Sequence, residues 1–272
     1  FKFKSNLLTL EKNIINPEKR KNKMETILLV NFYHKLSNFI DLDVLRTASD
    51  NYAGNGHCVV YRNQRLNYRI LRQSYFFSQL KGNIDLKKND KNFFLDIGGG
   101  YGGFTEIVKK MCPNIKIIYM DIPPQLYVAE QYLKSIFYKK VAGFKETKEM
   151  EFITQDSFLD YDILIVTPWD IKKIQNDLID NFYNANSFQE MQKNTVSNYC
   201  KQLGRIVKGK IVLHEQREGN GAIVDPVTRI DYIDYMKLNG FNLVEEKLGS
   251  YGGHLRSDPS APFSHTDLYF FE

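Results

Sequence analysis

One carboxylate and a cluster of glycines follow a short apolar run in the segment FFLDIGGGYGGF at 93–104. Asp96 precedes Gly98 by two residues, and Gly100 and Gly102 continue the spacing D-x-G-x-G-x-G. Glycine has no Cβ, so the backbone can turn tightly here and come within contact distance of a ligand. Helical spacing of apolar residues follows, so the N–H groups at the start of that helix would face the ligand. The pattern predicts a nucleotide-like cofactor at this turn.

The same letters satisfy G-x-G-x-x-G through Gly98, Gly100 and Gly103, so a dinucleotide is an alternative cofactor. Two features favour S-adenosylmethionine. Asp96 is placed to hold its ammonium group, and the run IKIIYMDIP predicts a second strand ending in Asp121, suited to accept hydrogen bonds from both ribose hydroxyls. Nicotinamide enzymes also carry an acid there, so a NAD-dependent oxidoreductase stays open. The predicted cofactor contacts on these segments are Asp96, Gly98, Gly100, Tyr101, Gly102, Asp121 and Ile122.

Two further strand ends are expected to complete the cofactor site. DILIVTPWDI reads as a buried strand followed by Trp169 and Asp170, whose ring and carboxylate suit adenine and its exocyclic amine. A tryptophan at the edge of the core with no ligand explains Trp169 equally well. LIDNFYNA predicts a fourth strand, and Asn186 and Ser187 follow it. Carboxyl ends of parallel strands meet at one edge of a sheet, so these residues should share an edge with the glycine turn.

A row of arginines precedes the glycine turn. Arg62, Arg65, Arg69 and Arg72 are spaced three, four and three residues apart, and a helix is expected over about 64–80. On that helix the last three would share one face. The planar guanidinium group suits carboxylate and phosphate, so these three are predicted to bind the acceptor, with Arg72 placed to contact either the acceptor or the cofactor's carboxylate. A solvated cationic face is the alternative explanation.

These motifs require a sheet to position them. Apolar strand patterns alternate with helical ones after residue 90, which is typical of an α/β sheet with helices on both faces. The last two strand-like runs, FNLVEEKLG and TDLYFFE, predict a terminal antiparallel hairpin. We therefore predict a doubly wound, seven-stranded, Rossmann-like sheet with an N-terminal helical cap, and the terminal hairpin resembles the one that class I methyltransferases add to such a sheet. The expected division is a flexible leader at 1–23, an acceptor-binding cap at 24–90 that begins with a helix over 24–40, and a cofactor-binding domain at 91–272.

The composition, 43% hydrophobic and 25% charged, is that of a soluble globular protein. A net charge of +5 is mild, and it fits an anionic small molecule better than duplex nucleic acid. No apolar run approaches the ~20 residues that span a bilayer. The three cysteines, Cys58, Cys112 and Cys200, favour a reducing cytoplasm over a disulfide framework or a zinc site. Because no tight acidic cluster is visible, we expect no metal ion. Lysine-, asparagine- and isoleucine-rich usage indicates an AT-rich bacterial genome.

Four segments together resemble a family of sugar O-methyltransferases within the class I S-adenosylmethionine-dependent methyltransferases. They are LDIGGGYGGF, IIYMDIPPQLYVAEQYL, TPWDI and NSFQEM, and the similarity covers about residues 60–215. The resemblance implies that Asp96, the three glycines and Asp121 match the family's cofactor motifs and that residues 186–191 match the signature after its fourth strand. It also implies methylation of a hydroxyl on a sugar, or on a phosphorylated or nucleotide-linked sugar, in bacterial polysaccharide biosynthesis.

Methyl transfer to a sugar hydroxyl requires alignment and, because the hydroxyl is a poor nucleophile, benefits from a general base. His214, which ends a fifth strand in GKIVLHEQ, is the first candidate because its ordinary pKa lies near neutrality. Glu190 in SFQEM and His254 in the closing loop are the rivals. Each has a structural alternative: His214 as a hydrogen-bonded residue at a strand end, Glu190 as an acid favoured by a helix dipole, and His254 as a plain loop residue.

The expected partners follow from these motifs. The cofactor is S-adenosylmethionine, with S-adenosylhomocysteine as product, and the acceptor is a small molecule, anionic or nucleotide-linked. No nucleic acid or membrane partner is expected, a homodimer is compatible with the sequence, and the expected location is the cytoplasm. Three alternatives stay open: methylation of a phosphate-derived oxygen on a glycan precursor, a NAD-dependent oxidoreductase, and a binding module without catalysis.

Overall fold

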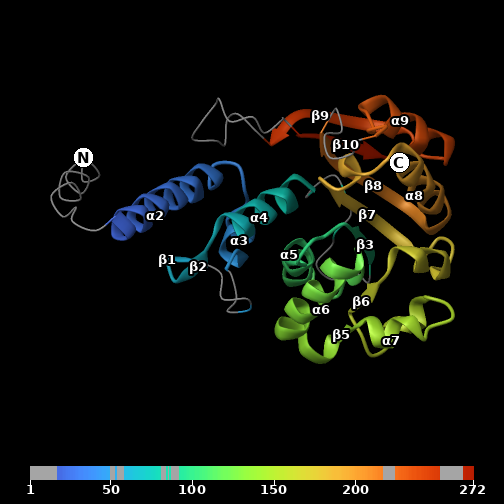
Figure 1. The fold of residues 1–272 in the computed structure, drawn as a ribbon, viewed down its shortest axis with the longest axis horizontal. Helices are drawn as coiled ribbons and strands as arrows, with labels where there is room; N and C mark the ends of the chain where they lie inside the picture. The colour runs from blue at the N-terminus through green and yellow to red at the C-terminus, as the bar shows by residue number, and fades with distance from the viewer. Residues whose placement is uncertain are drawn as a thin grey trace.

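The structure is a computed structural model that describes residues 17–49, 53, 58–80, 84, 86, 92–216, 224–251 and 266–272. An N-terminal helical region, blue to teal in Figure 1, precedes an α/β body. Among the described residues, no helix combines the length and apolar character needed to cross a bilayer.

The body contains a mixed sheet in the order β5-β6-β4-β3-β7-β8-β10-β9. Neighbouring strands from β5 to β8 are parallel, and β10 is antiparallel to both β8 and β9. In chain order the strands are β3 (Phe93–Ile97), β4 (Lys116–Met120), β5 (Val141–Ala142), β6 (Ile163–Val166), β7 (Ile179–Ala185), β8 (Val207–Gln216), β9 (Leu243–Tyr251) and β10 (Thr266–Phe271). This confirms the predicted fold and its terminal hairpin; the two-residue edge strand β5 adds an eighth strand to the seven expected.

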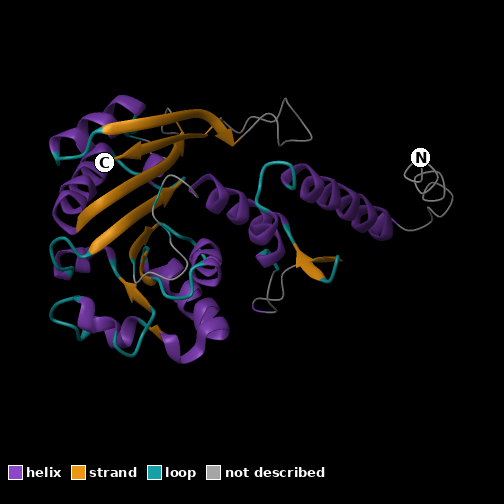
Figure 2. Cartoon of the chain, turned by 180° about the vertical axis from the view of Figure 1, so that it is seen from behind, coloured by secondary structure: helices purple, strands orange, loops and turns teal. Residues whose placement is uncertain are grey.

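Helices cover both faces of this sheet, as Figures 1 and 2 show. The α-helices of the body are α5 (Gly103–Met111), α6 (Pro123–Phe137), α7 (Phe144–Lys148), α8 (Lys193–Ile206) and α9 (Arg229–Leu238). Short 3-10 turns are η2 (Tyr138–Lys140), η3 (Gln155–Phe158), η4 (Pro168–Lys173) and η5 (Phe188–Glu190). The central strand β3 is buried at all five positions, as its apolar run predicts for a strand covered on both sides. It pairs with β4 and β7, so the segments after these three strands meet at one edge.

The N-terminal region contains α2 (Pro17–Leu36), α3 (Leu42–Thr47), the hairpin of β1 (Val59–Tyr61) and β2 (Gln64–Leu66), and α4 (Tyr68–Leu80). Its buried side chains belong to the same hydrophobic cluster as those of α5 and α6, so cap and body share a core. Residues 17–23, which the sequence assigned to a flexible leader, form the start of α2, and residues 1–16 lie outside the described part. The helix predicted over 24–40 instead ends at Leu36.

The helix predicted from about residue 64 is wrong at its start. Residues 64–66 pair with 59–61, and the two residues between them, Arg62 and Asn63, have φ values of 50° and 61°. Positive φ at both central residues is typical of a tight hairpin turn. The helix begins only after Asn67, whose side-chain oxygen accepts a hydrogen bond from the Ile70 N–H at 2.9 Å and caps it. Arg65 therefore lies in β2, and the four arginines do not form one helical row.

Candidate functional site

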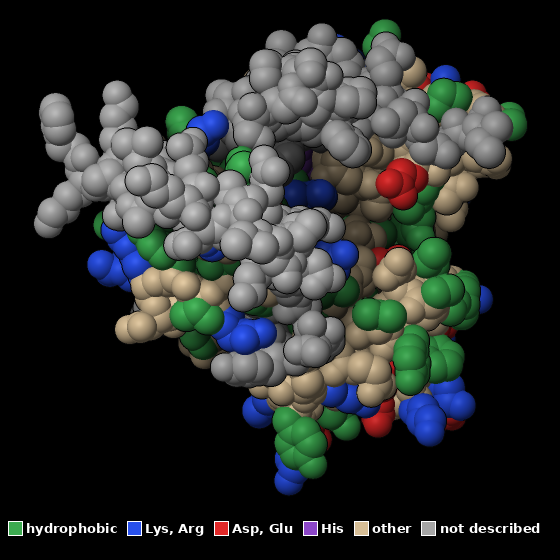
Figure 3. Space-filling view, turned by 60° about the vertical axis from the view of Figure 1, so that its left-hand side comes forward, with side chains coloured by type: hydrophobic (Ala, Val, Ile, Leu, Met, Phe, Trp, Pro, Cys, Tyr) green, Lys and Arg blue, Asp and Glu red, His purple; other side chains and the backbone are tan. Residues whose placement is uncertain are grey.

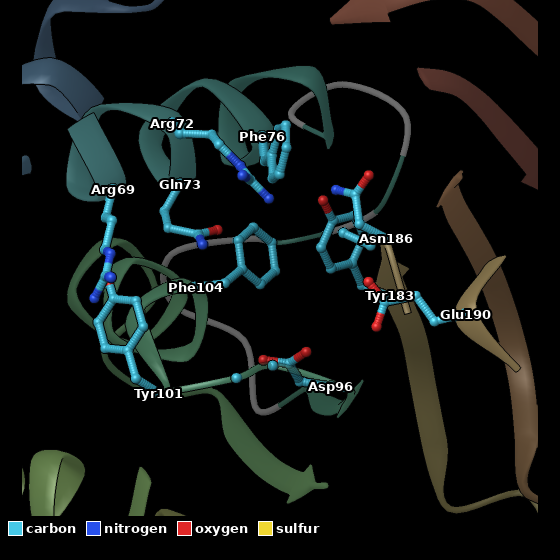
Figure 4. A pocket seen from close by; sticks show the side chains of 14 residues that line it. Arg69, Arg72, Gln73, Phe76, Asp96, Tyr101, Phe104, Tyr183, Asn186 and Glu190 are labelled. Carbon is cyan, nitrogen blue, oxygen red and sulfur yellow. The ribbon is translucent and has the colours of Figure 1, made fainter. Parts of the chain in front are cut away.

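A cavity of about 330 Å³ opens at the carboxyl edge of β3 and β7, beneath α4. This volume lies within the roughly 300–1,000 Å³ of small-molecule sites. Figure 4 shows side chains of α4 on one side of it and those that follow β7 on the other, with Asp96 below. In Figure 3 this face is hollowed, and Lys or Arg side chains lie at the hollow. The lining residues are Arg69, Arg72, Gln73, Phe76, Asp96, Gly98, Gly99, Gly100, Tyr101, Phe104, Tyr183, Ala185, Asn186 and Glu190.

The glycine turn needs its glycines for two different reasons. Gly98 has φ of 76°, and a Cβ added there would lie 2.2 Å from Ser187 Oγ. Gly100 has φ of 63°, but a Cβ there would meet no atom within 4 Å. Positive φ favours glycine at both positions. At Gly98 the space is filled by protein, whereas at Gly100 it is open, so a ligand can approach the backbone of Gly100.

Asp96 forms the floor of the cavity and is 2% exposed. Its carboxylate accepts a hydrogen bond from the Thr105 hydroxyl at 2.7 Å, and it forms no ion pair with any described residue. Burial raises the pKa of Asp96 to about 7, with a smaller contribution from the charge of Asp121, while the Thr105 bond opposes the rise. A cationic group bound beside it would favour the charged carboxylate. This is the environment that an ammonium group of a cofactor would match.

Asp121 follows β4 and is half-buried. Its Oδ2 atom accepts hydrogen bonds from the Gly100 N–H at 2.9 Å and the Tyr119 hydroxyl at 3.2 Å, and its Oδ1 atom accepts one from the Ile122 N–H at 2.7 Å. Burial raises the pKa of Asp121, and the bonds from Ile122, Gly100 and Tyr119 oppose this. The carboxylate thus adjoins the turn as expected, and binding of ribose stays a prediction.

Trp169 and Asp170 lie apart from this cavity. Trp169 is 57% exposed and lines a second cavity of about 460 Å³ between α6, α7 and the turn after β6. Both oxygens of Asp170 have partners, because the Thr167 hydroxyl donates to Oδ2 at 2.5 Å and Lys173 lies 3.1 Å from Oδ1. Ile122 is exposed and immediately precedes Pro123, which lines the second cavity. Of the predicted cofactor residues, five line the first cavity and Trp169 lines the second, whereas the others line neither. The five are Asp96, Gly98, Gly100, Tyr101 and Asn186.

Two of the three predicted acceptor-binding arginines line the first cavity. The Arg72 guanidinium lies 5.1 Å from the centre of the Phe76 ring and points into the cavity (Figure 4). The Arg69 guanidinium lies 5.9 Å from the centre of the Tyr101 ring. Arg65 does not line the cavity, because it lies in β2 rather than on α4. The site therefore offers a pair of arginines from one helix face.

His214 lies behind the cavity rather than in it. The side chain is fully buried, and its ring packs against Phe76 with the ring centres 4.3 Å apart. Its Nδ1 atom is 3.5 Å from the Tyr183 hydroxyl. Burial, with the charge of Arg72 adding to it, lowers the pKa of His214 to about 3, so the imidazole is neutral near pH 7. Phe76 and Tyr183 both line the cavity, so they stand between His214 and a ligand.

The turn after β7 carries the remaining predicted residues. Glu190 and Asn186 line the cavity, and Glu190 is exposed. Ser187 lies beneath the turn, where its hydroxyl accepts a hydrogen bond from the Asn184 amide at 2.8 Å. The Asn186 N–H donates to the carbonyl oxygen of His214 at 3.0 Å. His254 lies outside the described residues. Of the three predicted bases, Glu190 is the one that the structure places at the cavity.

Several cavity residues were missed from the sequence. Gln73 and Phe76 share a face of α4 with Arg69 and Arg72. They follow Arg69 by four and seven residues, and this helical spacing was the signal that could have revealed them. Phe104, Tyr183 and Ala185 also line the cavity, and Phe104 stacks on Tyr183 with ring centres 4.2 Å apart. Glu215, which is buried and binds the turn after β7 without lining the cavity, was missed too, although it directly follows His214.

The described residues contain no group of three or more His, Cys, Asp or Glu side chains arranged to hold a metal ion. Metal independence stays a prediction.

No protein-family model matches the chain, and neither does any curated protein. Solved structures do. A candidate sarcosine dimethylglycine methyltransferase from Galdieria sulphuraria is 13% identical with a TM-score of 0.52, over 74% of this chain and 84% of that one. Magnesium protoporphyrin IX methyltransferase from Synechocystis, solved with S-adenosylhomocysteine, is 11% identical with a TM-score of 0.50. The match covers 85% of this chain and 93% of that one.

Mitomycin 7-O-methyltransferase is 11% identical with a TM-score of 0.46, over 75% of this chain and 57% of that one. The chain thus spans little more than half the length of that enzyme. The two stronger likenesses agree with the strand order and terminal hairpin described above. The chain has the fold of the class I S-adenosylmethionine-dependent methyltransferases.

Proposed function

We propose that this protein is an S-adenosylmethionine-dependent O-methyltransferase acting on an anionic, sugar-type acceptor. The observation that carries the proposal is Asp96, a buried carboxylate without an ion pair among the described residues, at the floor of a cavity lined by glycine backbone. A bound ammonium group would supply the missing counter-charge. The fold, and the methyltransferase names of the structures that share it, support the same conclusion.

The residues present fit this donor. Asp96 would hold the ammonium group, and the open space at Gly100 admits the ligand to the backbone. Asp121 would accept hydrogen bonds from the ribose. Trp169, which lines the second cavity, would flank the adenine together with Ile122 and Asp170. When bound, the donor supplies an electrophilic methyl group on a sulfonium. The protein's task is then to align the acceptor oxygen and exclude water.

The acceptor would lie between α4 and the turn after β7. Arg69 and Arg72 would bind its anionic group, since guanidinium groups pair with carboxylates and phosphates. Asn186 would hydrogen-bond its hydroxyls, and Glu190 would take the proton of the reacting hydroxyl as the carbon–oxygen bond forms and the sulfur–carbon bond breaks. The aromatic rings of Phe76, Phe104 and Tyr183 offer apolar surface for the C–H face of a sugar. Glycan biosynthesis in a bacterial cytoplasm is the corresponding physiological setting.

Calorimetric titration with S-adenosylhomocysteine and with NAD tests the donor. We expect binding of the former, with the Asp96→Asn variant binding more weakly. Binding of NAD alone would instead assign an oxidoreductase.

A second screen tests the acceptor. Isotope-labelled S-adenosylmethionine is incubated with nucleotide-linked sugars, sugar phosphates, uronates and matched neutral sugars. We expect transfer only to anionic sugars. Transfer to a neutral sugar alone would contradict the arginine assignment, and donor binding without transfer to any compound would favour a binding module.

A further inference from the structure

Both peptide groups of Gly100 are held by side chains from the end of β4. The Gly100 N–H donates to Oδ2 of Asp121 at 2.9 Å, and the Gly100 carbonyl oxygen accepts a short hydrogen bond from the Tyr119 hydroxyl. The same hydroxyl lies 3.2 Å from Oδ2 of Asp121. These three residues form a closed hydrogen-bonded ring, here called the Gly100 clamp. It fixes the backbone at Gly100, where a Cβ would meet no atom within 4 Å, unlike at the other glycines of this turn.

Tyr119 is built into the turn rather than placed beside it. The residue is fully buried and pairs with Asp96 across the parallel strands β3 and β4. A Cβ added at Gly99 would lie 2.4 Å from Cε2 of Tyr119 and 2.7 Å from Oδ2 of Asp96. The ring therefore lies directly under the turn, and only glycine at position 99 leaves room for it. Burial raises the pKa of Tyr119 well above its usual value, so the hydroxyl keeps its proton and remains a donor.

The clamp divides the two oxygens of Asp121 between different tasks. A carboxylate oxygen accepts about two hydrogen bonds. Oδ2 receives the Gly100 N–H and the Tyr119 hydroxyl, while Oδ1 receives only the Ile122 N–H. One acceptor position therefore remains on Oδ1, where the sequence pattern suggested two ribose contacts.

We propose that Tyr119 is a positioning residue for the methyl donor, holding the Gly100 peptide groups and the Asp121 carboxylate in the geometry that a bound nucleoside needs. The inference rests on the proposed function. Without the Tyr119 hydroxyl, the Gly100 carbonyl and Oδ2 of Asp121 each lose a donor, and the turn is free to adopt other conformations. Binding would then have to order the turn, and the free-energy cost of this ordering would weaken the affinity for the donor. A preorganised turn avoids that cost.

The test compares Tyr119→Phe with Tyr232→Phe. Tyr232 is also fully buried, but its hydroxyl has no hydrogen-bond partner among the described residues, so its exchange removes the same atom without breaking a bond. Calorimetry with S-adenosylhomocysteine should show binding about five- to tenfold weaker for Tyr119→Phe, the effect of one hydrogen bond, and unchanged for Tyr232→Phe. Equal affinity of Tyr119→Phe and wild type would overturn the proposal.

A double-mutant cycle separates positioning from a general loss of packing. Asp121→Asn replaces an acceptor of the clamp with a group that can donate. If Tyr119 acts through the clamp, the further exchange of Tyr119 for Phe in that background should cost less than about twofold in affinity. Costs that simply multiply would show that Tyr119 acts by packing alone, and would also overturn the proposal.

Amide hydrogen exchange of the peptide fragment that contains the glycine turn tests the clamp in the absence of ligand. Amide exchange at the turn should be faster in Tyr119→Phe than in wild type, and unchanged in Tyr232→Phe. Equal exchange rates in all three proteins would reject the clamp. If wild type shows the protected turn but does not bind S-adenosylhomocysteine, the proposed function fails while the clamp stands.

Discussion

The carboxylate of Glu215 accepts a hydrogen bond from the backbone N–H of Gln189 at 3.1 Å, and a second from the N–H of Ser187 at 3.3 Å. Glu215 is fully buried at the end of β8, and the two N–H groups belong to the turn after β7. A side chain of one strand thus fixes the turn that carries Glu190 to the cavity.

Glu215 should make stability depend on pH. Burial raises its pKa to about 8 from a usual value of 4.5, so the folded state holds this proton more tightly than the unfolded state. Its contribution to stability is fully present below about pH 4.5 and is lost as pH rises through about 8, with a slope of up to about 1.4 kcal/mol per pH unit. In Glu215→Gln, the fall in unfolding free energy between about pH 5 and pH 8 should be shallower, as measured by chemical denaturation.

Parallel curves for wild type and Glu215→Gln would contradict this expectation.

Asp96 should make donor affinity depend on pH. Its pKa of about 7 means that it is partly protonated near neutrality, and a bound ammonium group favours the ionised form. Affinity for S-adenosylhomocysteine should therefore rise as pH rises through about 7, with proton release below that pH. Calorimetry in buffers of different ionisation enthalpy measures both the affinity and the number of protons released on binding. Asp96→Asn should bind more weakly and without this pH dependence.

Thr105→Val offers a sharper variant of that experiment. The Thr105 hydroxyl donates to Asp96 at 2.7 Å and opposes the rise of its pKa. Its removal should shift the midpoint of the affinity profile to higher pH. A shift to lower pH would exclude Asp96 as the titrating group.

Arg72 should be sensitive even to a conservative exchange. Lysine keeps the charge but loses the planar pair of donors that suits carboxylate or phosphate. Arg72→Lys should raise the KM for an anionic acceptor by about tenfold or more, the effect of one charge-assisted hydrogen bond, and leave donor affinity within about twofold. Arg62→Lys is the control, because Arg62 lies in the turn between β1 and β2. It should leave the KM for the acceptor and the affinity for the donor unchanged. Equal effects of the two exchanges would remove Arg72 from the acceptor site.

Glu190 should affect the rate of transfer rather than binding of the donor. Glu190→Gln keeps the size of the side chain but cannot take a proton, so the transfer rate should fall by about 10²-fold, a typical contribution of a general base. Affinity for S-adenosylhomocysteine should not change. Glu149→Gln, at an exposed glutamate outside the cavity lining, should retain the wild-type rate. Full activity of Glu190→Gln would direct attention to His254.

The glycine turn could be predicted from the sequence because its signals are local. A buried strand, the spacing of Asp96 and the glycines, and the following helix all lie within one short segment. The start of α4 could not be placed by apolar spacing, because residues 64–66 pair with 59–61 and because Asn67 caps the helix. Arg65 was therefore assigned to the wrong element.

His214 and Trp169 show a second limit. A strand pattern places His214 at the correct edge of the sheet, but the rings of Phe76 and Tyr183 in front of it come from distant segments. The sequence likewise places Trp169 after β6. It does not show that the side chain lies toward α6 and α7 instead of at the first cavity. Strand order and strand ends follow from local patterns, whereas the occupants of the space above a strand end depend on packing between distant parts of the chain.

Ser187 Oγ occupies the position next to Gly98 where a Cβ would stand, at 2.2 Å from that point. The segment assigned to the donor and the segment that presents Glu190 therefore share one small volume. A larger residue at position 98 would conflict both with the φ of 76° and with Ser187, so homologous sequences should keep glycine at 98 even where residue 187 is smaller.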